Sequence, residues 1–342
     1  METAFPLVSV SGTAFQMGYQ HGKQAASLIR RYLAWIEKLA GQPRAALCAN
    51  ALRFLPLIEK LSKPYADEIM GLAEGAQISV GEAVLCQTRA EAAHRFEGAC
   101  TAFALTGSAT RDGHPLAGQN QDLEPEYAEV AIVLHVHPSD GRPRAVMLTF
   151  AGQLGYAGMN QHGVAHFANA LYHFTWRPGL PHYPLKRVLL EQPGVPECVE
   201  LLRRHRTCSA ANVVLCDGRG RIADVEVRPE GIALYNDDHP DRRLHSNHYV
   251  SREFAPFEDG HLPDSCPRLD RIRALVRDNW GRLSVDRMKE ILADHAGDPA
   301  AICRHGASGM LSICGYIAEP AKGRFHIRRG LGCQGHWETY IV

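Results

Sequence analysis

One cysteine, Cys100, lies where a helical segment of the chain gives way to a strand-rich one. The next expected strand, Gly118-Gln119-Asn120-Gln121-Asp122, carries an amide and a carboxylate. A cysteine nucleophile needs a base to form its thiolate, and a histidine usually supplies it. If the bond between Ala99 and Cys100 were broken, the new α-amino group, with an ordinary pKa of about 7.7–8.0, could take the proton of its own thiol. Cys100 would then be an N-terminal nucleophile.

Cleavage of this bond would require the Cys100 sulfur to attack the carbonyl carbon of Ala99 and form a thioester, which water then hydrolyses. The small side chain of Ala99 leaves room for the attack, and Gly98 gives backbone freedom for a strained turn. Composition alone favours Cys100 as one more buried thiol with no catalytic role, because free cysteines are among the most buried residues of folded proteins. The surrounding motifs have to decide whether Cys100 is a nucleophile or a buried thiol.

The bulk composition describes an ordinary globular protein. Of 342 residues, 45% are hydrophobic and 22% are charged, which predicts a sizeable core. Lysine plus arginine equals aspartate plus glutamate at 37 each, so the charge gives no reason to expect nucleic acid or a membrane as a partner. The amino terminus lacks a secretory signal pattern, and no stretch approaches about 18 uninterrupted apolar residues. We therefore expect a cytoplasmic protein that acts on a small molecule.

The sequence predicts no metal site and no cofactor. The ten cysteines are scattered, and no Cys-x-x-Cys pair suggests zinc or a redox dithiol. Three histidine pairs could chelate a metal, but no carboxylate or cysteine cluster completes a site around any of them. They are His135 with His137, His162 with His166, and His245 with His248.

The elements that must position Cys100 fall into two groups. Apolar periodicity, two capping boxes and prolines predict three helices before it, over residues 13–39, 44–73 with breaks at Pro56 and Pro64, and 79–94. Strands are expected later at 129–137, 144–150, 164–171, 211–216, 222–227, 311–318 and 324–328, with helices at 185–191, 196–204, 268–279 and 284–295. This order of strands and helices fits two sheets covered by helices.

Six motifs, in order along the chain, give this sequence a family resemblance. It resembles the acyl-coenzyme A:6-aminopenicillanic acid acyltransferase-like autoproteolytic cysteine hydrolases, which belong to the N-terminal nucleophile hydrolase superfamily. The motifs are Gly12-Thr13-Ala14-Phe15-Gln16-Met17-Gly18-Tyr19-Gln20-His21-Gly22, Ala99-Cys100-Thr101, Gly118-Gln119-Asn120-Gln121-Asp122, Ala151-Gly152-Gln153-Leu154-Gly155-Tyr156-Ala157-Gly158-Met159-Asn160, Asn169-Ala170-Leu171 and His245-Ser246-Asn247-His248.

The resemblance implies an α+β fold, a four-layer αββα sandwich with an N-terminal helical segment. It also implies autocleavage between Ala99 and Cys100. A helical α chain, residues 1–99, would be released but retained in the fold, and a catalytic β chain, residues 100–342, would carry two antiparallel sheets. The expected partners are therefore the two chains of one precursor and a small amide or acyl substrate; a higher oligomer is left open.

The resemblance assigns roles to four residues. Cys100 is the nucleophile, and Asp122 orients its amino group. Asn247 donates its side-chain amide to the oxyanion, and such a donor is typically worth about 2.7–4 kcal/mol of barrier. Asn169 lends a backbone N–H to the same oxyanion hole; a strand asparagine that satisfies a bulge is the alternative.

This sequence departs from the family pattern at two positions and leaves one set of residues open. Gln121 replaces the usual tryptophan, which predicts an altered pocket wall, and Ala99 replaces the usual glycine before the nucleophile. The family also places a late hydroxyl and an arginine near the site. Ser308, Ser312 and Arg304 are the candidates, and the sequence does not distinguish among them.

The predicted function is an amidohydrolase or acyltransferase that cleaves an amide bond of a small N-acyl or non-peptide substrate through an acyl-Cys100 thioester. Hydrolysis is favoured over acyl transfer, because water is always present. An unprocessed thiol acyltransferase that pairs Cys100 with a histidine such as His248 is one alternative. A non-catalytic binding scaffold of the same fold is the other. Phe103, Tyr156, Phe167 and Tyr172 would fit an aromatic or acyl pocket, or ordinary core packing.

Overall fold

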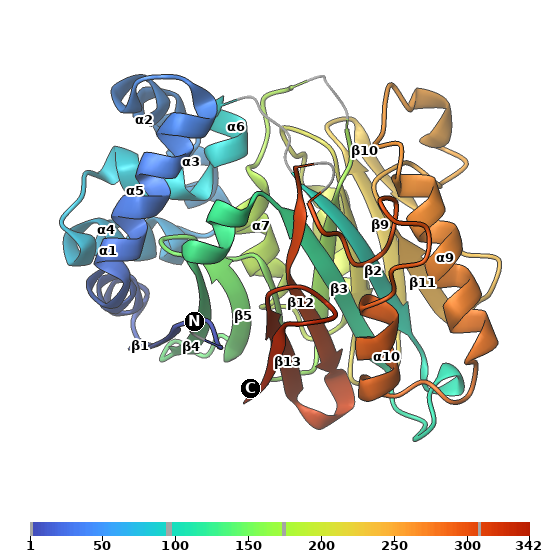
Figure 1. Cartoon of the computed structure of the whole chain (residues 1–342). Coiled ribbons are helices and arrows are strands. Elements are labelled where there is room, and N and C mark those ends of the chain that lie inside the picture. The colour runs from blue at the N-terminus through green and yellow to red at the C-terminus, as the bar shows by residue number, and fades with distance from the viewer. Residues whose placement is uncertain (1–2, 94–97, 173–175, 307–308) are drawn as a thin grey trace.

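The strands of the protein form two sheets that pack face to face, with helices on their outer sides (Figure 1). The computed structural model describes residues 3–93, 98–172, 176–306 and 309–342. The first sheet has eight strands in the order β1-β4-β5-β6-β7-β8-β9-β10, and the second has six in the order β11-β2-β3-β12-β13-β14. Between them, the ring of Phe167 in β7 stacks on Tyr316 in β12 at a centroid distance of 5.9 Å.

The helices and strands have the following bounds. The helices are α1 (Ala14–Ala40), α2 (Arg44–Leu52), α3 (Leu55–Leu61), α4 (Lys63–Ala76), α5 (Val80–Gln87), α6 (Arg89–Ala93), α7 (His182–Leu189), α8 (Val195–Arg204), α9 (Ser265–Asp278) and α10 (Val285–Leu292). The strands are β1 (Leu7–Gly12), β2 (Ala99–Leu105), β3 (Leu116–Leu123), β4 (Ala131–Pro138), β5 (Ala145–Phe150), β6 (Ala157–Asn160), β7 (Ala165–Ala170), β8 (Ala211–Cys216), β9 (Ile222–Arg228), β10 (Gly231–Leu234), β11 (Arg242–His245), β12 (Leu311–Glu319), β13 (Arg324–Arg329) and β14 (His336–Ile341).

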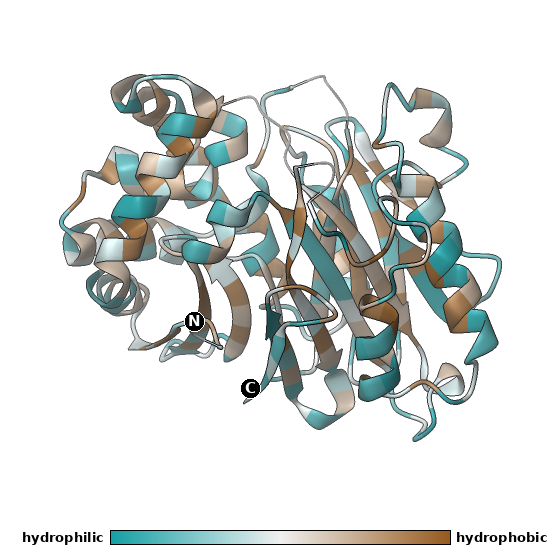
Figure 2. Cartoon of the chain, in the orientation of Figure 1, coloured by the Kyte–Doolittle hydropathy of each residue, from teal (hydrophilic) through white to brown (hydrophobic). Residues whose placement is uncertain are grey.

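Helices cover both outer faces and complete an αββα arrangement, which confirms the expected fold class. Helices α9 and α10 bury Leu269 and Ile291 against Phe103 of β2. On the other side, α7 and α8 bury Leu185 and Leu202 against β8 and β9. Along α9, hydrophilic and hydrophobic patches alternate, as expected for a helix with one face on a sheet and one in water (Figure 2).

The helices before Cys100 follow the sequence pattern closely but are more numerous than expected. Thr13 and Gln16 form the capping box of α1, and Gly41 ends the helix in a left-handed conformation, with φ 61°. The second expected helix is divided into α2, α3 and α4, with Pro56 and Pro64 in the first turns of the last two. The third is divided into α5 and α6. Among described residues no single helix is long and apolar enough to cross a bilayer; α4 and α5 meet that test only together, across a 120° bend.

The first 99 residues are not purely helical, and the first sheet is not purely antiparallel. Strand β1, Leu7–Gly12, pairs in parallel with β4, so that Leu7 lies opposite Val133 and Gly12 opposite Pro138. Its residues alternate between exposed and buried, which is the pattern of an edge strand with one face on the core. The parallel pairing is possible because a long segment, with six helices, separates β1 from β4. The N-terminal segment is therefore built into the sheet of the C-terminal one.

Strand β2, which begins at the junction, occupies the interior of the second sheet. It pairs with β11 on one side and with β3 on the other, where Ala99 lies opposite Asp122 and Cys100 opposite Gln121. Phe103 and Leu105 point toward α9 and α10, whereas Ala102 and Ala104 belong to the core between the sheets. Because side chains alternate along a strand, Cys100 faces the same side as Ala102, toward the first sheet.

Candidate active site

The peptide at the junction is held by hydrogen bonds from four residues that lie far from it in the sequence. The hydroxyl of Tyr172 donates to the carbonyl of Gly98 at 2.8 Å. The backbone N–H of Cys100 donates to Oδ1 of Asn247 at 2.9 Å. The carbonyl of Cys100 accepts from Nη1 of Arg268 at 2.6 Å and from Nδ2 of Asn169 at 3.3 Å. The residues before and after the Ala99–Cys100 bond are thus fixed on both sides.

Gly98 has a backbone conformation that favours glycine. Its φ is 90°, and a Cβ there would lie 2.6 Å from Cδ2 of Leu123. The next atom it would meet is the backbone oxygen of Asp122, at 3.2 Å. The turn into β2 therefore requires glycine directly before Ala99, as the sequence suggested.

Arg268 is the residue of this site that sequence reasoning missed. It is fully buried on α9 and donates to four groups, two through each terminal nitrogen. Besides the carbonyl of Cys100, they are Oγ1 of Thr101 at 3.0 Å, Oδ1 of Asn247 at 2.7 Å and Oδ1 of Asp264 at 3.1 Å. The sequence does place Asp264 four residues before Arg268 at the start of a helix. Ion pairs on helix surfaces commonly have the same spacing, so this signal alone does not indicate a functional site.

Asp122 lies on β3 and is completely buried. Its Oδ1 accepts from the hydroxyl of Ser312 at 2.6 Å, and its Oδ2 has no hydrogen-bond partner among the described residues. Burial raises the pKa of this carboxyl group. In the ladder it lies opposite Ala99, one residue before the nucleophile. The side chain is therefore next to the bond that cleavage would break.

Ser312 and Arg304, two of the three candidates for the late hydroxyl and arginine, have different positions. Ser312 contacts Asp122 directly, and its Oγ also accepts from the backbone N–H of Arg304 at 2.9 Å. The Arg304 guanidinium pairs with Oδ2 of Asp264 at 2.5 Å, and Asp264 also accepts from Arg268. Ser308 lies outside the described residues. One polar network thus joins Asp122 to the carbonyl of Cys100.

The two asparagines expected in the oxyanion hole both contact the junction. Nδ2 of Asn247 donates to the carbonyl of Ala170 at 2.9 Å, while its Oδ1 accepts from Cys100 and Arg268. Asn169 touches the junction through its side chain, whose Oδ1 in turn accepts from Asn212 at 3.4 Å. This side-chain contact was not anticipated, and the backbone role of Asn169 stays a prediction.

The Cys100 thiol is not ionised in the uncleaved chain. Burial, followed by the charge of Asp122, raises its pKa to about 12. His248, the expected base of the alternative mechanism, has its Nδ1 at 2.7 Å from Oγ of Ser265, and no hydrogen bond joins it to Cys100 in the described chain. Burial also lowers the pKa of His248 to about 4. The pairing of Cys100 with His248 therefore has no support in the geometry.

A pocket opens beside Cys100. Tyr156 and Tyr183 form aromatic walls, and Gln121 is part of the lining at the position where the family has tryptophan. The Nζ of Lys186 lies 4.3 Å from the Tyr156 ring centroid. Burial lowers the pKa of Lys186 to about 8, so that near neutral pH this ammonium can receive an anionic group.

Of the four aromatic residues named from the sequence, only Tyr156 lines this pocket. Phe103 packs under α9 and α10, and Phe167 stacks between the sheets. Tyr172 holds the carbonyl of Gly98. The alternative of core packing is therefore correct for Phe103 and Phe167. Strand alternation could have placed Phe103, because it is an odd number of residues from Cys100.

Comparison with known proteins finds similarity to an acyltransferase and to two hydrolytic enzymes. It is 28% identical to the 40 kDa form of the acyl-coenzyme A:6-aminopenicillanic-acid-acyltransferase of Emericella nidulans, over 87% of this chain and 84% of that one. Two solved structures resemble it at TM-scores of 0.49 and 0.41, with 14% and 13% identity. They are a variant of conjugated bile acid hydrolase from Clostridium perfringens (71% of this chain, 97% of that one) and penicillin V acylase from Agrobacterium tumefaciens (67% and 83%).

The family match itself covers residues 109–330, which include Asp122, Asn169 and Asn247 but begin after Cys100. That range is well over half of the chain. The protein is therefore a member of the acyl-coenzyme A:6-aminopenicillanic acid acyl-transferase family.

Proposed function

We propose that the protein cleaves itself between Ala99 and Cys100 and then uses Cys100 as an N-terminal nucleophile to hydrolyse the amide bond of a small N-acyl substrate. Family membership supports an enzyme that acts on amide bonds. The proposal that Cys100 is freed by self-cleavage and acts as the nucleophile rests on one observation. Hydrogen bonds hold the junction peptide on both sides, while Cys100 lines a pocket.

Self-cleavage proceeds in two steps. The Cys100 sulfur adds to the carbonyl carbon of Ala99, the C–N bond breaks, and the thiol proton passes to the departing nitrogen. Water then adds to the thioester, and the S–C bond breaks to leave the carboxylate of Ala99 and a free thiol. Asn247, which already accepts from the Cys100 nitrogen, would hold the new amine.

Substrate hydrolysis repeats this chemistry with an external acyl group. The α-amine of Cys100 takes the thiol proton, sulfur attacks the substrate carbonyl, and the proton passes to the leaving amine. An amide nitrogen carries two hydrogens, and only one of those of Asn247 is needed for the carbonyl of Ala170. The other is suited to donate to the oxyanion.

The N-terminal segment is expected to stay bound after cleavage. It contributes β1 to the first sheet and buries α1 residues such as Ile29 and Leu33 in the main core. Arg329 of β13 also donates to the carbonyl of Ala4 at 2.8 Å. Loss of one peptide bond removes none of these contacts.

The pocket favours substrates that carry an aromatic or apolar group together with an anionic group. Tyr156 and Tyr183 would contact the former and Lys186 the latter. Release of amine should therefore be screened with penicillins, N-acyl amino acids and β-amino acid amides, and the intact mass of the acyl-enzyme followed. Turnover that persists in Cys100→Ala would contradict the proposal and place the chemistry at another site. Acyl transfer rather than hydrolysis would appear as dependence on an added amine.

A further inference from the structure

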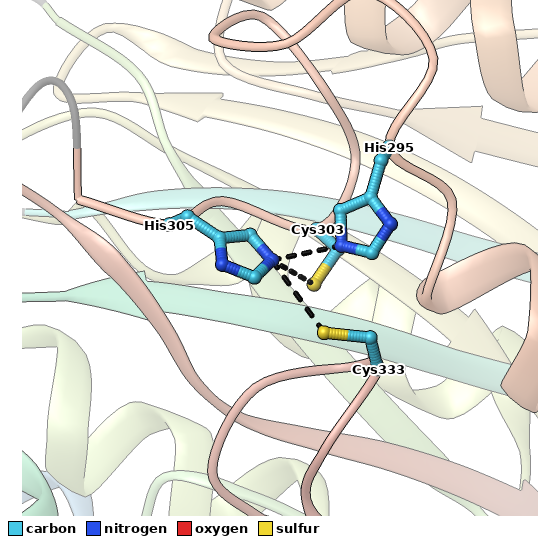
Figure 3. Close-up of side chains that lie close together, drawn as sticks. All are labelled: His295, Cys303, His305 and Cys333. Carbon is cyan, nitrogen blue, oxygen red and sulfur yellow. Dashed lines mark hydrogen bonds between the residues drawn. The ribbon is translucent and has the colours of Figure 1, made fainter.

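Four side chains with soft or borderline metal-binding atoms converge on one side of the second sheet (Figure 3). His295 follows α10, Cys303 and His305 precede β12, and Cys333 lies between β13 and β14. One ligand atom of each lies within 4.8 Å of the ligand atoms of the other three. Cys333 is 28 residues beyond His305, so the fold brings it to the other three ligands.

The two nitrogen–sulfur distances from His305 fit a tetrahedral ion. Nε2 of His305 lies 3.5 Å from Sγ of Cys333 and 3.7 Å from Sγ of Cys303. With zinc bonds of about 2.3 Å to sulfur and about 2.0–2.1 Å to nitrogen, two ligands at the tetrahedral angle are separated by roughly 3.6 Å for a nitrogen–sulfur pair. Nε2 of His295 lies 2.8 Å from Nε2 of His305, and a move of about 0.5 Å would bring this pair to the tetrahedral separation.

The surroundings hold the ligands and leave a way in. Cys303 is buried, whereas the other three ligands are exposed, so an ion can enter from solvent. Asp294, next to His295, makes a two-pronged ion pair with Arg271 at 2.8 and 2.6 Å. A Cβ at Gly332 would lie 3.0 Å from Sγ of Cys303, so the glycine before Cys333 lets the two loops approach.

We propose that His295, Cys303, His305 and Cys333 bind one zinc ion. Two thiolates and two imidazoles prefer zinc to magnesium or calcium, which take oxygen ligands. Four protein ligands fill a tetrahedral shell and leave no open position, which is typical of a structural site rather than a catalytic one. The expectation of no metal came from the lack of a Cys-x-x-Cys pair, and it did not consider ligands that separate loops bring together.

The ion would fix the loop that carries Arg304, which lies between two of the ligands in the sequence. The backbone N–H of Arg304 donates to Ser312, and Ser312 donates to Asp122. The Nη2 of Arg304 pairs with Asp264, which also accepts from Arg268. Zinc therefore holds the far end of the network that reaches the junction, although its binding does not depend on cleavage at Cys100.

Metal binding can be tested on the full chain after reduction and removal of metal with a chelator. One equivalent of Co²⁺ should give thiolate-to-cobalt charge-transfer bands and the strong visible bands of a tetrahedral site, and Zn²⁺ should displace it. Native mass spectrometry should show one zinc per chain. Cys333→Ser should lower the charge-transfer intensity by roughly half, because one of two thiolates is lost. His295→Ala, at an exposed position, should weaken zinc binding more than about tenfold.

Cys266→Ser is the matched control, because Cys266 is also an exposed free cysteine but lies outside the cluster. It should bind metal like the parent protein. Cobalt spectra that are unchanged in both Cys333→Ser and His295→Ala would overturn the proposal. So would the absence of cobalt bands in the folded parent. A parent protein that forms a Cys303–Cys333 disulfide, seen as a mass lower by two hydrogens, and that binds no metal after reduction would also overturn it.

Discussion

Replacement of Arg268 by lysine tests whether the polar contacts at the junction govern self-cleavage. The guanidinium reaches the carbonyl of Cys100 and Oγ1 of Thr101 with one nitrogen, and Asn247 and Asp264 with the other. A lysine ammonium keeps the charge but concentrates its donors at one point, so it cannot span both sets. Arg268→Lys should therefore leave one set of groups without its donor.

The size of the effect follows from the contacts that are lost. Hydrogen bonds that involve a charged group contribute about 1.5–3 kcal/mol each. Asp264 keeps its second arginine partner, Arg304, so no carboxylate is left unpaired in the interior. A loss of about 2 kcal/mol at the junction corresponds to a self-cleavage rate lowered roughly 30-fold.

The assay is a time course of cleavage after synthesis, followed by denaturing mass spectrometry, together with a thermal melt of each variant. Arg273→Lys is the control, because Arg273 is on the same helix and donates to the hydroxyl of Tyr235, away from the junction. The control should cleave at the parent rate. Parent-like cleavage of Arg268→Lys, or equal slowing of both variants, would refute the reasoning.

Three further predictions concern Asp122, Tyr172 and His21. Asp122→Asn removes the buried charge that Ser312 contacts, and we expect slower cleavage and turnover in a protein that still folds; unchanged rates would show that the charge is not used. Tyr172→Phe deletes the hydrogen bond to Gly98 and should slow cleavage about fivefold, for a bond of about 1 kcal/mol, with little change in the melting temperature. His21 accepts from the backbone N–H of Gly152 at 3.1 Å, and burial, with the charge of Arg187, lowers its pKa to about 3. In the unfolded state His21 takes up a proton near pH 6.5, whereas in the folded state it does so only near pH 3. The contribution of neutral His21 to the free energy of unfolding is therefore fully present above pH 6.5. It falls by up to about 1.4 kcal/mol per pH unit on acidification toward pH 3. His21→Gln should flatten the acid side of the stability curve measured by urea denaturation, and an unchanged slope would contradict the assignment.

Local signals in the sequence, such as capping residues, glycines and prolines, were sufficient to predict the elements whose ends these residues determine. Helix α1 begins and ends where the Thr13 capping box and Gly41 predict. The strands expected at 211–216 and 222–227 are β8 and β9, which pair with each other. Pro56 and Pro64 mark new helices because proline fits the first turn but not the interior. The positions of Cys100, Asp122 and Asn247 near one another followed from the resemblance rather than from local pattern.

Features that depend on distant parts of the chain could not be predicted. Strand β1 is short, and its partner β4 is more than a hundred residues away. Arg268 looks like a common helix arginine until α9 packs against the start of β2. The two cysteines of the proposed zinc site are 30 positions apart, so no spacing rule identifies them. In each case the residues meet only in the folded chain, so neither local pattern nor spacing along the sequence identifies them.

Denaturing mass spectrometry of the purified, active protein, with sequencing of each amino terminus, tests the central claim most directly. The account predicts two chains that stay together under native conditions, the larger beginning Cys100-Thr101-Ala102-Phe103, with a combined mass equal to the intact 37.7 kDa chain plus one water. Cys100→Ala should remain a single chain without turnover. A single intact 37.7 kDa chain in fully active parent protein would contradict the account.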